Sequence, residues 1–225
     1  MDPAACARLR DARVAAKLSL RELSRRVGIS ASMLSQIENG RAQPSVATLY
    51  ALVSTLSVSL DELLSGSAAW VEKPAAPVVT AAERAVLVMD TGVTWERLTS
   101  GPDPMVDALL VTYPPGSVSS SGGGLMSHAG REYGFLLSGL LTVRLGFESF
   151  VLEPGSSVSF DSAIPHAYVN EGTEDARGVW HVVGGNPISG HHAAPAPAAA
   201  HAEFPVFGRR PAEDAVDAAD TTGVK

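Results

Sequence analysis

The chain of 225 residues has a single cysteine and no long apolar run. Cys6 cannot form an intrachain disulfide, so a framework of cross-links is excluded and a reducing compartment is favoured. No apolar stretch approaches the roughly 18 residues that a membrane-spanning helix needs. The first residues, MDPAACARLRDARVAAK, lack the apolar core of a secretory signal. These absences predict a cytoplasmic protein without a membrane segment.

Acidic residues outnumber basic ones, and the formal net charge of −7 at pH 7, taken alone, argues against a nucleic-acid partner. The charge is unevenly distributed, however. Residues 1–60 contain eight Lys and Arg against four Asp and Glu, whereas the remaining residues contain nine against twenty. A basic first part followed by an acidic second part favours contact with phosphate at one end of the chain only.

Residues 19–41, SLRELSRRVGISASMLSQIENGR, carry the strongest functional signal. Ser19 and Glu22 form a capping box that predicts a helix starting at Leu20. Apolar residues then recur at helical spacing on one side of this helix, with charged residues on the other. Gly28 supplies a left-handed turn residue after it. The segment therefore predicts two short helices joined by a tight turn.

Ser30 is placed to cap the second helix, expected over residues 31–38. The outer face of that helix is small, polar and uncharged, and it comprises Ala31, Ser32, Ser35 and Gln36. Such a face can enter the major groove of DNA, where the Gln36 amide is suited to a bidentate contact with adenine. For each of these residues the alternative is an ordinary solvated helix surface.

From Arg8 to Leu64 the sequence resembles the helix-turn-helix domain of the XRE family of bacterial regulators, through SLRELSRRVGIS, LSQIENGR and PSVATLYALVSTLSVSLDELL. The resemblance implies a lambda-repressor-like domain of five short helices at residues 1–66. It also implies that the third helix reads bases while the ENGR segment and nearby helix starts hold phosphate. Ala31 departs from the family, where a longer polar side chain is common, and it can touch only a thymine methyl group. Carried over by position, the DNA-binding residues are Ala31, Ser32, Ser35, Gln36, Asn39, Arg41, Ser19 and Arg21.

The composition changes beyond this first domain. Residues 67–82 are rich in Ala and Pro without periodicity and predict a linker. Residues 83–185 contain short β-branched and apolar runs separated by turn residues, which predict an antiparallel sandwich or barrel. Residues 186–225 combine Pro, Ala and acidic residues without a packing pattern and predict a flexible tail. The expected fold class is therefore α + β in two domains.

A second group of polar residues lies in the predicted β region and comprises His128, Glu132, Gly139, Pro165, His166 and Asn170. On an extended strand, the side chains of His128 and Glu132 would project to the same face. The spacings resemble the two cupin motifs, H-x3-E-x6-G and P-H-x3-N, and imply a C-terminal jelly-roll barrel. In the cupin family three histidines and a glutamate bind a divalent metal, but Met126 stands where the first histidine would lie.

Three candidate metal ligands remain, and two His with one carboxylate can hold Fe, Mn, Zn or Ni with positions open. These ligands are His128, Glu132 and His166. Methionine is a poor ligand for such metals, so Met126 is expected to lower the affinity. The alternative is a metal-free ligand pocket lined by Met126, His128, Glu132 and His166. In that pocket the polar groups hydrogen-bond one another or an organic molecule.

A helix-turn-helix domain, a linker and a cupin domain, in this order, are the layout of many bacterial transcriptional regulators. The resemblance implies a non-enzymatic, nucleoid-associated homodimer that binds a palindromic double-stranded DNA operator and senses a small-molecule effector. Non-haem iron oxygenases such as the epoxidase of fosfomycin biosynthesis have the same layout and the H-x3-E ligand pattern, so an enzyme is the alternative. A metal-free sugar or amino-acid binding module is a third hypothesis.

Overall fold

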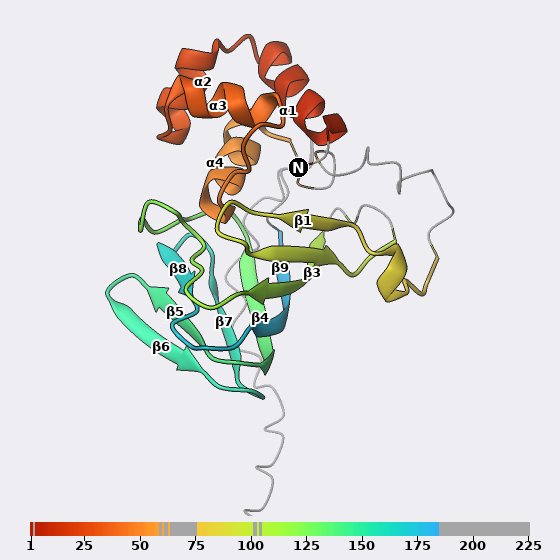
Figure 1. Cartoon of the computed structure of the whole chain (residues 1–225), viewed down its shortest axis with the longest axis vertical. Helices are drawn as coiled ribbons and strands as arrows, with labels where there is room; N and C mark the ends of the chain where they lie inside the picture. The colour runs from red at the N-terminus through yellow and green to blue at the C-terminus, as the bar shows by residue number, and fades with distance from the viewer. Residues whose placement is uncertain are drawn as a thin grey trace, which may run out of the picture. The chain divides into compact units, whose positions relative to one another are not determined.

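Four α-helices form the first part of the chain (Figure 1) and are α1 Pro3–Ala15, α2 Leu20–Val27, α3 Ala31–Glu38 and α4 Val46–Leu56. The predicted starts of α2 and α3 are confirmed, because Ser19 and Ser30 each accept a hydrogen bond from the backbone N–H three residues on. Ser45 caps α4 in the same way. Gly28 ends α2 in the left-handed region at φ 80°. The Glu22 carboxylate, expected to reach back to Ser19, instead accepts from two arginines of its own helix.

The structure is a computed structural model that describes Met1, residues 3–58, Leu60, Leu63, residues 76–100, Asp103 and residues 105–184. These residues belong to one unit, Met1–Ser189, and the second unit, Gly190–Lys225, lies outside them. The predicted tail at 186–225 and residues 67–75 of the predicted linker also lie outside the described residues. None of the helices in the described part has the length and apolar character needed to cross a membrane.

The fifth helix expected before residue 66 falls mostly outside the described residues. Leu60 and Leu63, which are described, are helical and buried. The five-helix arrangement therefore stays a prediction, while the helix-turn-helix formed by α2 and α3 is observed. The core of this region is built from apolar side chains of all four helices and includes Leu9, Leu23, Leu34, Ile37, Leu49 and Leu52.

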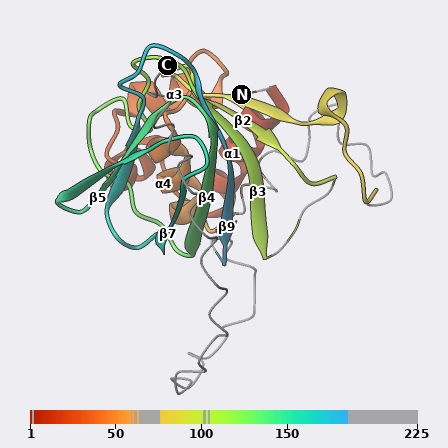
Figure 2. The same ribbon diagram turned by 90° about the horizontal axis from the view of Figure 1, so that it is seen from below.

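Two antiparallel sheets follow a short 3-10 helix, η1 Ala81–Glu83. The larger sheet has the order β1 (Val86–Val88), β2 (Thr94–Arg97), β3 (Val106–Tyr113), β9 (Ala176–Val183), β4 (Arg131–Ser138), β7 (Ser157–Asp161). The smaller has the order β6 (Glu148–Leu152), β5 (Leu141–Leu145), β8 (His166–Val169). Figure 2 shows β3, β9, β4 and β7 side by side. The predicted antiparallel β architecture is confirmed. The described strands pair as two separate sheets, so closure into a barrel is not confirmed.

Glycines on the larger sheet make room for one large side chain. A Cβ on Gly134 or on Gly178 would lie 2.5 Å from the indole ring of Trp180, so only glycine allows the ring to lie against the two strands. Gly139, the glycine of the first cupin motif, has φ 75°, and a Cβ there would lie 2.4 Å from the carbonyl oxygen of Asp175. This motif glycine therefore serves the fold of the chain after β4.

Helix α4 contacts the β region directly. Its Ala47 N–H donates to the Ser119 carbonyl at 3.0 Å, and the Asp90 N–H donates to the Pro44 carbonyl just before the helix at 3.1 Å. The N–H groups of a first helical turn have no partner within the helix, so a loop of the β region satisfies one of them. Tyr50 of the same helix also packs edge-on against Trp95 of β2. The helical and β regions therefore meet through α4.

Candidate functional site

Helix α3 presents its predicted outer face to solvent. Leu34 and Ile37 are fully buried on the opposite side. Ser32 and Gln36 are exposed, and the smaller Ala31 and Ser35 between them are half-buried. The face therefore has the orientation that base reading requires, and the contact with bases stays a prediction.

The end of α3 places two further predicted DNA-binding residues. Asn39 is the C-cap, and its amide Nδ2 donates to the Ser35 carbonyl at 2.7 Å. One donor of this side chain therefore stabilises the helix end, which makes Asn39 a structural residue as well as a candidate phosphate contact. Arg41 is exposed two residues beyond.

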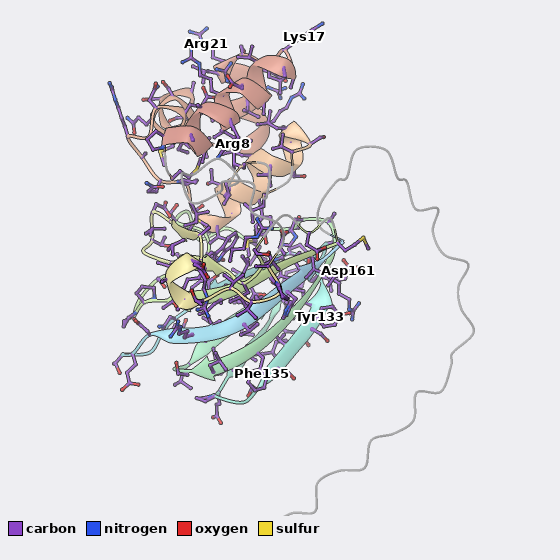
Figure 3. The ribbon with its side chains drawn as sticks, turned by 90° about the vertical axis from the view of Figure 1, so that its right-hand side faces the viewer. Arg8, Lys17, Arg21, Tyr133, Phe135 and Asp161 are labelled. Carbon is purple, nitrogen blue, oxygen red and sulfur yellow. The ribbon has the colours of Figure 1, made fainter. Side chains whose placement is uncertain are left out.

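The start of α2 presents the remaining predicted contacts. Ser19 and Arg21 are both exposed, and the side chains of Lys17 and Arg21 extend outward from the helical region (Figure 3). A helix N-terminus carries partial positive charge and unpaired N–H groups, and it therefore attracts phosphate. Ser19 accepts from the Glu22 N–H at 3.1 Å, so its hydroxyl hydrogen remains able to donate to an anion.

A buried ion pair, which local sequence patterns did not reveal, supports α3 from behind. Arg13 of α1 donates from Nε to Glu38 Oε1 at 2.6 Å and from Nη2 to Oε2 at 2.9 Å. The side chain of Glu38 is only 4% exposed, so its carboxylate depends on this bidentate partner. The hydrogen bonds to Glu38 raise the pKa of Arg13 and keep it charged. The pair fixes the last turn of α3 against α1.

The three predicted metal ligands come together in the β region. The Nε2 atoms of His128 and His166 each lie 3.0 Å from Oε1 of Glu132. Candidate ligand atoms of the three residues all lie within 4.8 Å of one another. Each of the three side chains is at most 5% exposed.

The route by which His128 reaches this cluster differs from the expectation. Strand β4 begins at Arg131, so His128 and Glu132 do not lie on one extended strand, and that interpretation was wrong. The chain turns at Gly130, which has φ 102°, and the turn brings the imidazole of His128 over the start of β4. His166 comes from β8 of the other sheet. The cluster therefore joins both sheets.

Backbone partners determine which imidazole nitrogens face the cluster. His128 Nδ1 lies 3.0 Å from the Ala129 carbonyl, and His166 Nδ1 lies 2.8 Å from the Ile164 carbonyl. Because a carbonyl can only accept, each Nδ1 donates to its backbone partner, and each ring turns its Nε2 toward Glu132 Oε1. The two Nε2 atoms and Glu132 Oε1 are buried and have no partner that satisfies hydrogen-bond geometry. These three converging atoms are the ones that a bound metal ion would share.

The second carboxylate oxygen of Glu132 is held by an aromatic pair. The Tyr168 hydroxyl donates to Oε2, and Trp180 Nε1 donates to the Tyr168 hydroxyl oxygen at 3.0 Å. Burial acts to raise the pKa of Glu132, but the two adjacent imidazoles outweigh it and lower this pKa to about 2. Glu132 is therefore an anion whose Oε2 is occupied and whose Oε1 remains available to a ligand.

A small cavity lies beside the cluster and is lined by Glu132 and Met126, whereas His128 and His166, also expected to line it, are not among its walls. Met126 is buried, and its N–H donates to the His166 carbonyl at 2.8 Å. Its thioether gives the cavity an apolar wall in place of a fourth nitrogen ligand. The cavity has a volume of about 20 Å³, which holds one ion or one water molecule.

Tyr50 of α4 also lines this cavity. Its ring stacks on the His128 imidazole with centroids 3.9 Å apart and planes within 10° of parallel. It meets Trp95 of β2 edge-on at 5.6 Å. Helix α4 therefore contributes two side chains, Tyr50 and Val46, to a cavity whose other walls belong to the β region.

Sequence reasoning missed Tyr50, Tyr168 and Trp180 as parts of the site. Tyr168 lies two residues after His166 on β8, so strand periodicity puts both on one face and could have identified it. Tyr50 has no such signal, because it comes from another region of the chain. Asn170 of the second cupin motif is fully buried, and its Nδ2 donates to the carbonyls of Tyr113 and Glu174. It is a structural residue of the motif and not a metal ligand.

The donor set fits one divalent metal ion. Two imidazole nitrogens and a carboxylate oxygen suit Fe(II), Mn(II), Zn(II) or Ni(II), and three protein ligands leave positions open. The backbone carbonyls behind both histidines and the Tyr168 hydroxyl behind Glu132 are the supporting contacts that metal ligands require. The geometry therefore agrees with the predicted ligands.

Comparison with known proteins identifies both regions. The helix-turn-helix family matches residues 9–63, and the cupin domain family matches residues 109–182. The HTH-type transcriptional regulator PuuR of Escherichia coli strain K12 is 28% identical over 165 residues, which cover 72% of this chain and 85% of that protein.

Solved structures show the same layout. The crystal structure of an HTH_3 family transcriptional regulator from Vibrio cholerae has a TM-score of 0.60 at 24% identity, covering 80% of this chain and 96% of that one. Hydroxypropylphosphonic acid epoxidase from S. wedmorenis has a TM-score of 0.40 at 22% identity, covering 80% and 97%, a likeness too low to support an argument about activity. This chain therefore contains a helix-turn-helix domain followed by a cupin domain, and over most of its length it is similar to an HTH-type transcriptional regulator.

Proposed function

We propose that this protein is a DNA-binding transcriptional regulator whose cupin pocket senses a small-molecule effector. The observation that carries the proposal is the outer face of α3, which is exposed, small, polar and uncharged. The helix is fixed by a cap at each end and by the buried Arg13–Glu38 pair, so this face is rigid before it meets DNA. Similarity to PuuR over most of the chain supports the same role.

In this proposal the outer face of α3 reads bases, whereas residues just after α3 and around the start of α2 contact phosphate. Gln36 reads a base edge by its amide, with Ser32, Ser35 and the Ala31 methyl group as shorter contacts. Arg21, Arg41, Asn39 and Ser19 contact phosphate and set the register of the helix on the duplex. The acidic β region then discourages non-specific wrapping of DNA.

A homodimer on a palindromic operator is part of the proposal. The outer face of β4 exposes three apolar side chains at alternate positions, Tyr133 (45%), Phe135 (45%) and Leu137 (50%). Figure 3 shows the first two on the strand. A row of exposed apolar side chains along one strand favours burial against a second copy, and a two-fold axis places two recognition helices about one helical turn apart on DNA.

The effector site is the pocket at His128, Glu132 and His166. These residues would hold one divalent metal, which when bound acts as a Lewis acid that anchors a donor atom of the effector. Apolar side chains around the cavity then contact the body of the effector. A regulator of this kind acts in the cytoplasm, on chromosomal DNA.

The proposal is tested by selection of genomic fragments. Purified full-length protein is mixed with sheared DNA from its own genome in moderate salt, with random DNA as competitor, and the retained fragments are sequenced. Enrichment of a few palindromic sites by the natural protein, but not by Gln36→Ala, is the expected result. Equal retention of all fragments would overturn sequence-specific regulation.

The ligand set also favours a second candidate function, a non-haem iron oxygenase. Two histidines and one carboxylate leave sites on iron for both substrate and O2. Tight stoichiometric iron together with substrate-dependent O2 consumption, in a protein that selects no DNA sites, would support the enzyme. A regulator, in contrast, retains selective DNA binding and consumes no O2.

A further inference from the structure

We infer that the Tyr50 ring of α4 is the lid of the cupin pocket, and that an organic effector enters only by displacing this ring from His128. The inference rests on the proposed function, because the pocket is the proposed effector site. It adds the physical route by which an occupied pocket acts on the DNA-binding region.

Tyr50 covers one of the candidate metal ligands, His128, at contact distance. A centroid separation of 3.9 Å with nearly parallel planes leaves no space for another group between Tyr50 and His128. The edge-on contact with Trp95 holds the ring from the side.

The closed cavity is too small for an organic effector. Its volume of about 20 Å³ admits a metal ion or a water molecule, but no ligand of several heavy atoms. Most of its other walls, including Leu109, Val111 and Tyr113 of β3, belong to strands paired on both sides. Tyr50 belongs to a helix that reaches the cavity from outside the sheets, so its movement breaks no strand pairing.

Displacement of Tyr50 must affect the helix that carries it. Leu49 and Leu52 of α4 are fully buried in the helical core, and α4 packs against α2. The helix therefore cannot shift alone, and the whole helical region moves or loosens with it. The hydrogen bond from Ala47 to Ser119 lies one turn before Tyr50 and is part of the same contact.

Binding of effector and binding of DNA are then linked through one contact. A ligand that expels Tyr50 changes the freedom of the two reading helices of a dimer, and so changes operator affinity. By thermodynamic reciprocity the operator changes effector affinity by the same factor.

The lid is tested with a metal and a simple donor. Full-length protein is loaded with Co(II), whose visible absorption reports its ligands, and is titrated with imidazole. Tyr50→Ala is expected to bind imidazole at least about tenfold more tightly than the natural protein, because no ring must be displaced. Tyr50→Phe, which keeps the stacked ring, and Phe147→Ala, which removes a fully exposed aromatic ring far along the chain, should match the natural protein.

Folding of each variant is checked by circular dichroism, and Tyr50→Leu is the second variant, since it retains apolar volume but cannot stack. Equal imidazole affinity in the natural protein, Tyr50→Ala and Tyr50→Leu would overturn the lid. Failure of the natural protein to bind Co(II) would overturn the inference that Tyr50 lies over a metal site.

The coupling is tested on DNA. Saturating imidazole should change the operator affinity of the natural Co(II) protein by at least about fivefold, and that of Tyr50→Ala by less than twofold. An unchanged affinity in the natural protein would overturn the coupling. A protein that binds no DNA selectively would refute the proposed function, whereas the Co(II) and imidazole comparison would still decide whether Tyr50 is the lid.

Discussion

The outer face of α3 and the metal-ligand cluster differ in how many parts of the chain build them. The face consists of four residues of a single eight-residue helix that is capped at both ends. The cluster takes His128 from a turn, Glu132 from β4 and His166 from β8, and is covered by Tyr50 from α4. The two sites also differ in burial, because the long side chain of the face, Gln36, is exposed and the cluster side chains are buried. The two kinds of polar group should therefore respond differently to substitution. Changes on the face should alter recognition with little effect on stability, whereas changes to buried polar groups should alter stability or ligand binding strongly.

The largest effect is expected at a buried pair beneath the exposed face. Arg13→Ala should lower the free energy of unfolding by about 3–5 kcal/mol, because Glu38 would keep a buried charge without its bidentate partner. Urea denaturation followed by circular dichroism measures this loss. Arg10→Ala removes an exposed arginine of the same helix and should change stability by less than about 0.5 kcal/mol. A loss below about 1 kcal/mol for Arg13→Ala would show that Glu38 finds another partner or becomes protonated.

The next largest effect is expected in the cluster itself. His166→Ala should weaken Zn(II) or Co(II) binding by more than about 100-fold, since loss of a residue behind a ligand alone costs about 10–100-fold. Competition with a chromophoric chelator measures the affinity. His181→Ala is the matched control, because His181 on β9 alternates with the inward-facing Trp180 and Val182 and lies on the other face. Equal losses in the two variants would mean that the metal binds elsewhere.

This contrast also explains how far the sequence could predict the structure. Ser19, Ser30 and Gly28 act on neighbours within three or four residues, so the starts of α2 and α3 were correct. His128, Glu132 and His166 were found only because their spacing matches a known family. The assumption of one extended strand from His128 to Glu132 failed, since a turn at Gly130 depends on tertiary structure.

The features that were missed join distant parts of the chain. The Arg13–Glu38 pair links α1 to α3, and the Tyr50–His128 stack links α4 to the β region. Neither contact has a periodic or capping signal, because each depends on how separately folded elements pack. Tyr168 was also missed, but it differs from these, because strand alternation from His166 was a signal that could have placed it on the same face.

A smaller effect, and one confined to binding, is expected on the exposed face. Gln36→Ala should weaken operator binding by about 1–3 kcal/mol and leave random DNA unaffected, because one base contact is lost. Arg21→Ala should weaken binding to operator and to random DNA equally. It should also lower the number of counterions released on binding, measured from the salt dependence of the affinity, by about one. Titrations at several salt concentrations separate the two. If Gln36→Ala weakened both DNAs alike, Gln36 would be a general surface contact and not a reader.

The smallest effect is expected at the cap of α3. Ser30→Ala should lower the free energy of unfolding by about 1 kcal/mol, since the Met33 N–H loses the hydroxyl that accepts from it at 3.0 Å. Ser30→Asp should restore most of the loss, because a carboxylate caps the same N–H. Ser32→Ala, on the exposed face of the same helix, should change stability by less than about 0.5 kcal/mol. Equal losses for Ser30→Ala and Ser32→Ala would mean that residues of the exposed face also stabilise α3. The separation between residues that recognise DNA and residues that stabilise the fold would then fail for this helix.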